Sequence, residues 1–181
     1  VHAIGDRAVH EVLDGFERLR EFERSQNIRG LRHRMEHVQL IDEQDKSRLA
    51  ELGIIASMQP YHVISDIRMA DAYWGGRAKN SFAWQIQNKA GATLAFGSDA
   101  PVEHPNPFWG LYAAVTRRCF DGYPGPQGWY PEQRLDLLDA LRAFTYGPAF
   151  ASGREDRVGK LASGYFADLV VLDKDLFQCQ A

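Results

Sequence analysis

The chain has 181 residues, of which 45% are hydrophobic and 25% charged, and this length suffices for one domain with a sizeable core. The formal net charge of −3 gives no basis for binding nucleic acid or an anionic membrane, and no apolar stretch approaches the length of a membrane span. The two cysteines form neither a disulfide framework nor a metal-binding cluster, so we expect a cytoplasmic protein.

The first half of the chain predicts alternating strands and helices. Strands are expected at the start of the chain and at 31–36, 54–58 and 93–97, and helices at 6–23, 42–53 and 81–89. Residues 60–79 have a loop-like composition, with an aromatic and glycine-rich centre, AYWGGRAKN. This order indicates parallel strands covered by helices, either in a doubly wound open sheet or in a barrel.

The second half predicts two more helices, at 108–118 and 135–144, separated by a segment rich in glycine and proline. The stretch VGKLASGYFADLVVLD that follows has strand-forming residues around a Ser163–Gly164 turn, which predicts a hairpin in a separate small β element. At the other end, Val1 is not a methionine and lies at once within a strand pattern, so we expect further residues to precede it.

Polar residues stand where each predicted strand ends. His2 closes the first strand, His37 the second and Gln59 the third, while Asp99 follows the fourth in the stretch LAFGSDAPVEHPNP. In either architecture the carboxyl ends of parallel strands share one face, where ligands bind. Two imidazoles and a carboxylate on that face are a reasonable ligand set for a divalent metal such as zinc.

Each of these residues also has a purely structural interpretation. His37 could belong to a salt-bridged loop beside Glu36, and Asp99 could begin a proline-rich turn. Their equivalent positions in successive units favour the metal site. In the neighbouring 60–79 segment, His62 lies on the proposed active face, and Tyr61, Tyr73 and Trp74 either line a substrate pocket or cover the rim of the sheet.

Several of these segments resemble a known family. HAIGDRA at 2–8, RMEHVQ at 34–39, ASMQPYH at 56–62 and GSDAPV at 97–102 are similar, in this order, to the C-terminal half of the amidohydrolase superfamily. The similarity is greatest to the branch that contains N-substituted formamide deformylase. The tail, TYGPAFASGREDRVGKLASGYFADLVVLDKD, resembles the segment by which these enzymes return to a small β-sandwich beside the barrel.

The resemblance implies an α/β fold in which residues 1–155 form strands five to eight of a TIM-type barrel and residues 156–181 form part of an accessory β-sandwich. It implies that His2, His37 and Asp99 are metal ligands, with Zn²⁺ or one or two other divalent ions as the cofactor. Gln59, Tyr61, His62 and Trp74 then line the substrate site. The His-x-His pair and the strand-four ligand of the family have no match in this sequence, so the chain would supply only part of the metal site.

The implied reaction is hydrolysis of a non-peptide C–N bond in a small amide, N-formyl or cyclic amide substrate. A metal-activated water would attack the carbonyl carbon, and Asp99 would accept its proton and pass it to the leaving amine. The competing interpretation is a catalytically silent barrel fragment. Exposed sheet edges invite pairing, so such a fragment could form a homodimer.

Overall fold

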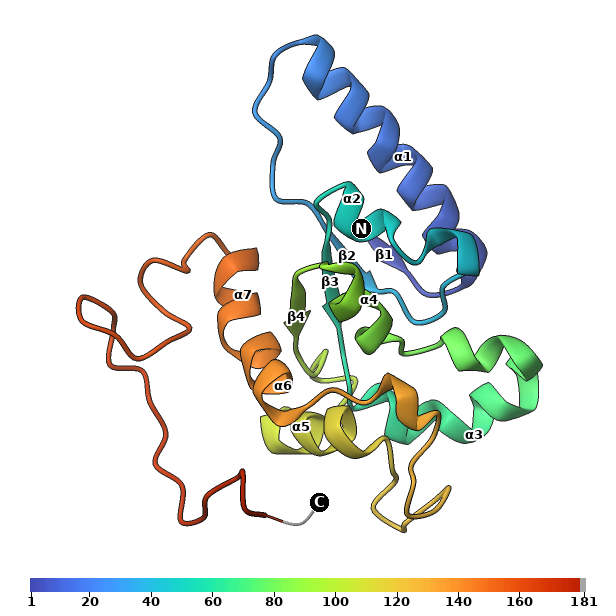
Figure 1. The fold of residues 1–181 in the computed structure, drawn as a ribbon, viewed down its shortest axis with the longest axis vertical. Helices are drawn as coiled ribbons and strands as arrows, with labels where there is room; N and C mark the ends of the chain where they lie inside the picture. Colours follow the sequence, from blue (N-terminus) through green and yellow to red (C-terminus); the bar gives the residue numbers. More distant parts are fainter. Residues whose placement is uncertain (180–181) are drawn as a thin grey trace.

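A computed structural model, which describes residues 1–179, shows a single four-stranded parallel sheet (Figure 1). The strands β1 (His2–Ala3), β2 (Arg34–His37), β3 (Ile55–Met58) and β4 (Leu94–Phe96) lie side by side in chain order. The register pairs Ala3 with His37 and Met58 with Phe96, so the carboxyl ends of the strands meet at one edge. The order has no reversal of the kind that defines a doubly wound sheet, which favours the barrel-type arrangement.

The first helix, α1 (Asp6–Ser25), confirms the prediction from apolar spacing. Its buried residues Val9, Leu13 and Phe16 face the core, while charged side chains cover its outer side. In Figure 1 α1 crosses the side of the sheet that carries β1 and β2. It therefore serves as the covering helix of the first strand–helix unit.

The region between β2 and β4 differs from the sequence prediction in one segment. Asp42 caps the 3-10 turn η1 (Glu43–Asp45), which is followed by α2 (Arg48–Glu51), and α4 (Trp84–Ala90) precedes β4. Residues 60–79 are not a loop: they form α3 (His62–Trp74) and the 3-10 helix η2 (Gly75–Asn80). The buried residues Val63, Ile67 and Ala70 of α3 have helical spacing, which the glycines and aromatic residues that follow obscured in the sequence.

Beyond β4, helices pack against the other edge of the sheet. Asn106 caps α5 (Pro107–Thr116), the 3-10 helix η3 (Pro131–Gln133) follows, and Asp136 caps α6 (Leu137–Phe144). A further helix, α7 (Tyr146–Ala151), was not predicted; it lies against β4, and Pro148 is tolerated because it falls in the first turn. A Cβ atom at Gly147 would lie 1.9 Å from the carbonyl oxygen of Leu94, so only glycine permits this contact.

The predicted C-terminal hairpin is not confirmed. Within residues 152–179 the structure contains no strand, and this part runs as an extended trace beside α7 (Figure 1). Its apolar side chains at Leu169, Val170 and Val171 are largely exposed. An isolated two-stranded hairpin is marginal in water, so a strand-forming sequence without a sheet to pack on has no reason to pair.

The buried core joins the sheet to its covering helices. Its largest fully buried apolar side chains include Trp84 of α4, Leu13 of α1, and Met35 and Met58 of the sheet. Within residues 1–179, every helix is too short or too polar to span a bilayer.

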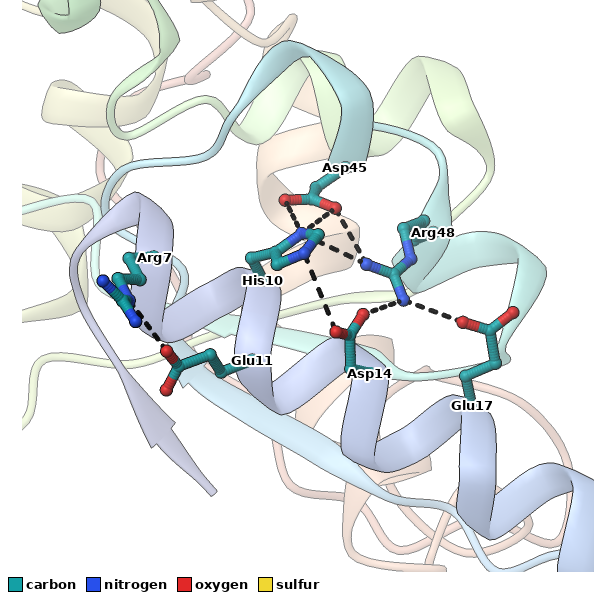
Figure 2. A network of polar contacts seen from close by, with 7 residues as sticks. All are labelled: Arg7, His10, Glu11, Asp14, Glu17, Asp45 and Arg48. Carbon is teal, nitrogen blue, oxygen red and sulfur yellow. Dashed lines mark hydrogen bonds and ion pairs between the residues drawn. The ribbon is translucent and has the colours of Figure 1, made fainter.

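A polar cluster fastens α1 to the segment after β2 (Figure 2). Asp45 is fully buried, and both of its carboxylate oxygens lie 3.0 Å from Nδ1 of His10. Arg48 donates to Asp45 at 2.9 Å, to Asp14 at 2.8 Å and to Glu17 at 3.0 Å. The hydrogen bond to the Asp45 carboxylate raises the pKa of His10, while the nearby Arg48 guanidinium opposes this shift.

We expect this cluster to make stability depend on pH. Because the pKa of His10 is raised in the folded chain, its contribution is complete below the ordinary histidine pKa near 6.5 and is lost as pH rises through the folded value. The difference in Tm between the wild type and His10→Asn should therefore be larger at low pH than at high pH. Thermal denaturation across this range measures it.

The matched comparison uses Asp45→Asn. In that background, the effect of His10→Asn on Tm should no longer vary with pH. A difference that varies equally in both backgrounds would contradict the role of the His10–Asp45 pair.

Candidate active site

The carboxyl edge of the sheet brings the predicted strand-end residues together. His2 lies in β1, His37 is the last residue of β2, Gln59 follows β3, and Asp99 follows β4 by three residues. The parallel pairing of the strands places all four at the same edge. The rings of His2 and His37 are in edge contact, with centroids 4.4 Å apart, and His62 at the start of α3 stacks on His37 at 5.9 Å.

An open cavity of about 350 Å³ lies at this edge. It is lined by His2, His37, His62, Trp74 and Asp99 among the predicted residues, and by Ile4, Gln39, Asp66, Met69, Val102 and Glu103, which sequence reasoning missed. His62, Asp66 and Met69 follow one another at helical spacing along one face of α3. Identifying 60–79 as a helix would therefore have revealed Asp66 and Met69.

The His37 imidazole is held in one orientation. Its Nδ1 lies 2.9 Å from Oε1 of Gln59, and since an amide oxygen only accepts, Nδ1 carries the hydrogen in this pair. The other nitrogen, Nε2, then keeps a lone pair for a ligand. A hydrogen bond of this kind is the usual way in which proteins orient a metal-binding histidine.

Burial lowers the pKa of His37, and the neighbouring His2 lowers it further. The bond to Gln59 and the Asp99 carboxylate act in the opposite direction without reversing the shift. His37 is therefore neutral at physiological pH. The neutral imidazole is the form that binds metal.

The backbone has a left-handed conformation at two of these residues. His37 has φ 76° and Asp99 has φ 58°, which lie in the left-handed region that residues other than glycine rarely adopt. Backbone of this kind costs energy and concentrates at functional sites. At His37 this conformation coincides with the end of β2, whereas Asp99 lies in the segment that follows β4.

The donor types suit a divalent cation, but the structure does not show a closed metal site. His2, His37 and Asp99 line the same cavity, and imidazole with carboxylate is a common ligand set for zinc. In the part of the chain that the structure describes, no three His, Cys, Asp or Glu side chains form a group able to hold one ion. The metal-ligand roles of the three residues stay predictions.

The aromatic residues predicted to line the pocket separate into two sets. Trp74 lines the cavity, whereas Tyr73 is 79% exposed and does not. Tyr61 is also absent from the cavity wall: it stacks on Trp109, with ring centroids 5.6 Å apart. The role of Tyr61 in substrate binding stays a prediction.

A buried arginine binds the backbone of a segment next to the site. Arg117 is fully buried and donates to the carbonyl oxygens of Phe82 and Trp129, both at 2.6 Å, and of Ser81 at 3.3 Å. Its guanidinium lies 4.7 Å from the ring centroid of Trp84. Phe82 and Trp84 line one small pocket together with His37 and His62, so Arg117 holds a segment that borders these two histidines.

A parallel sheet covered by helices, with histidines and an aspartate around a cavity at its carboxyl edge, is the arrangement of an α/β enzyme. A family model described as the Amidohydrolase family matches residues 1–181, and the chain belongs to this family.

Three relatives illustrate the similarity. The chain is 35% identical to YtcJ of Bacillus subtilis, named as an amidohydrolase, over 98% of this chain and 32% of YtcJ. It is 27% identical to N-substituted formamide deformylase of Arthrobacter pascens, over 99% of this chain and 32% of that enzyme. A crystal structure of an uncharacterized metal-dependent hydrolase from Pyrococcus horikoshii matches 96% of the chain and 33% of its own, with TM-score 0.79 and 33% identity. The chain thus spans about a third of the length of these relatives.

Replacing Arg117 tests whether its hydrogen bonds to backbone carbonyl groups stabilise the fold. Arg117→Met should lower the free energy of unfolding by about 3 kcal/mol, because it leaves buried carbonyl groups without donors. Arg29→Met, at an exposed position, is the control and should change stability by less than about 0.5 kcal/mol. Urea denaturation of both variants gives the comparison, and equal stabilities would contradict the assignment.

Proposed function

We propose that this chain contributes to a metal-dependent hydrolase that cleaves non-peptide C–N bonds in small amide, N-formyl or cyclic amide substrates. The observation that carries the proposal is the contact of two imidazoles, His2 and His37, at a cavity that Asp99 also lines. The names of two relatives, an N-substituted formamide deformylase and a metal-dependent hydrolase, support the reaction and the metal dependence.

His2, His37 and Asp99 would hold the metal through Nε2 of His37, a nitrogen of His2 and the carboxylate of Asp99. A divalent ion such as zinc supplies a water that is nucleophilic near neutral pH and polarises the carbonyl group. Gln59 keeps the His37 ring in place through its bond to Nδ1. The relatives are about three times as long as this chain, which supports a site that this chain supplies only in part.

The other residues act on the proton and the substrate. The Asp99 carboxylate accepts the proton of the attacking water and delivers it to the amine nitrogen as the C–N bond breaks. We assign substrate binding also to His62, whose side chain lines the cavity and whose buried Nε2 has no hydrogen-bond partner. Trp74 provides an aromatic wall for the apolar part of the substrate.

We also propose that residues 1–155 form strands five to eight of a barrel, and that 156–181 form part of an accessory β-sandwich. The sequential order of the four strands supports the first assignment. The exposed apolar residues Leu169, Val170 and Val171 support the second, since they suit a strand that packs on another sheet.

A second candidate is a silent fragment that forms a homodimer. The observation in its favour is that β1 and β4 are the outer strands of the described sheet and each pairs on one side only. Outer strands of this kind are templates for pairing with another chain. A metal-free dimer in solution would favour this candidate, and a monomer that binds zinc tightly would exclude it.

The test of the hydrolase is Asp99→Asn. Zinc affinity should fall by at least about 100-fold, because a ligand is lost, and in the full-length parent enzyme, where the site is complete, kcat for hydrolysis of an N-benzylformamide probe should fall by about 100-fold or more. Calorimetry with zinc, the mass in solution and the hydrolysis rate are measured on the same preparations. Asp168→Asn, at an exposed position of the tail, is the matched control. Unchanged zinc binding and hydrolysis in Asp99→Asn would overturn the proposal.

A further inference from the structure

The charged side chains of the cavity wall, apart from its histidines, are all acidic. Asp66, Asp99 and Glu103 line the cavity, and its wall includes neither lysine nor arginine. Throughout the described part of the chain, none of the ion pairs involves these three carboxylates. With Asp99 assigned to the metal, two negative charges face the cavity without a cationic partner.

Neutral hydrogen bonds fix these two carboxylates in position. Asp66 accepts from Nε2 of Gln39 at 2.8 Å, and Glu103 accepts from Oγ of Ser65. The bond to Ser65 ties the loop after β4 to α3, so both carboxylates stand on walls that α3 determines. A neutral donor orients a carboxylate but does not cancel its charge, and the negative potential therefore remains directed at the cavity.

The arginines nearest in sequence are committed elsewhere. Arg68 on α3 pairs with Asp121 at 2.8 Å and lies over the Tyr123 ring, and Arg77 on η2 pairs with Asp6 at 2.6 Å. Neither lines the cavity. These two arginines therefore do not neutralise the negative charge of the cavity wall.

A second and independent feature points to a ligand. His62 is only 9% exposed, and its Nε2 is buried without a hydrogen-bond partner, although the side chain lines the cavity. Buried polar atoms normally have partners, so this nitrogen in a cavity-lining side chain leaves a hydrogen bond for a ligand or an ordered water to make. Ile4, Met69 and Trp74 add apolar surface around it.

On the basis of the proposed function, we propose that this site selects substrates with a cationic ammonium group, which Asp66 and Glu103 bind while the apolar wall holds the carbon skeleton. An ammonium group gains Coulomb energy from both carboxylates, and an aromatic side chain such as Trp74 adds a favourable surface for a cation. The cavity, at about 350 Å³, has the size of a site for a small organic molecule.

The proposal is tested with three probes of similar shape: benzylamine, which is a cation at neutral pH, benzyl alcohol and benzoate. Calorimetry on the metal-stripped chain should show benzylamine binding about tenfold tighter than benzyl alcohol, the scale of one ion pair at a partly hydrated site, and benzoate weakest. Added salt should reduce this preference. Equal affinities for amine and alcohol would overturn the proposal.

Variants assign the preference to the two carboxylates. Asp66→Asn and Glu103→Gln should each weaken benzylamine binding by about three- to tenfold and leave benzyl alcohol unchanged. Glu21→Gln, at an exposed position on α1, removes the same charge away from the cavity and is the control. If the two cavity variants behave like the control, the carboxylates do not bind the amine.

Measurements of zinc binding distinguish a failure of the ammonium proposal from a failure of the proposed hydrolase function. Zinc affinity should persist in Asp66→Asn and Glu103→Gln, whereas Asp99→Asn should lose zinc affinity and keep the preference for benzylamine. Loss of the amine preference with intact zinc binding would overturn the substrate class alone. If Asp66→Asn and Glu103→Gln abolish zinc binding, the acidic wall belongs to the metal site and the proposal is wrong.

Discussion

Parallel pairing of the four strands in one register determines where the polar residues at the strand ends lie. Ala3 is opposite His37, and Met58 is opposite Phe96, so the residues that follow each strand reach the same edge of the sheet. Because side chains alternate along a strand, a shift of one residue in β2 would turn His37 to the other face. The left-handed backbone at His37 coincides with the end of β2, and Asp99, which is also left-handed, follows β4 by three residues. The pairing of the strands therefore fixes the strand-end residues before any ligand is bound.

Below this edge the molecule keeps a charged group in its interior without using a carboxylate. Arg117 is satisfied by three backbone carbonyl groups, and burial lowers its pKa to about 9, so it remains charged at neutral pH. A buried carboxylate partner would neutralise it, but would add a second ion that must be desolvated. The carbonyl groups of Ser81, Phe82 and Trp129 share the compensation of this charge, and their hydrogen bonds to Arg117 join the segment before α4 to the segment around Trp129.

Local patterns predicted those parts of the fold that depend on nearby residues. The apolar spacing of α1 acts within a few positions, and the structure confirms this helix. Residues 60–79 were wrongly predicted as a loop because of the glycines and aromatic residues near the end of this segment. The helical spacing of Val63, Ile67 and Ala70 was overlooked. The hairpin predicted in the C-terminal tail is not confirmed for a different reason: whether a strand pairs depends on contacts with distant parts of a protein, which the local sequence does not specify. Asp66 and Glu103 were missed for the same reason: their convergence depends on how α3 packs beside the loop after β4.

The cavity at the carboxyl edge of the sheet combines a neutral imidazole with charged carboxylates. Burial and the neighbouring His2 keep His37 neutral, so that its nitrogen is free to bind, while Asp66 and Glu103 form only neutral hydrogen bonds and add negative charge. Neutral imidazoles provide directed lone pairs, and carboxylates provide a less directional attraction for positive charge. His2 and His37 are in edge contact at the strand ends, and His62 of α3 stacks on His37, whereas the two carboxylates stand on α3 and on the loop after β4. Under the two proposals, the strand-end residues would hold the metal, and the carboxylates of α3 and of the loop after β4 would hold the ammonium group.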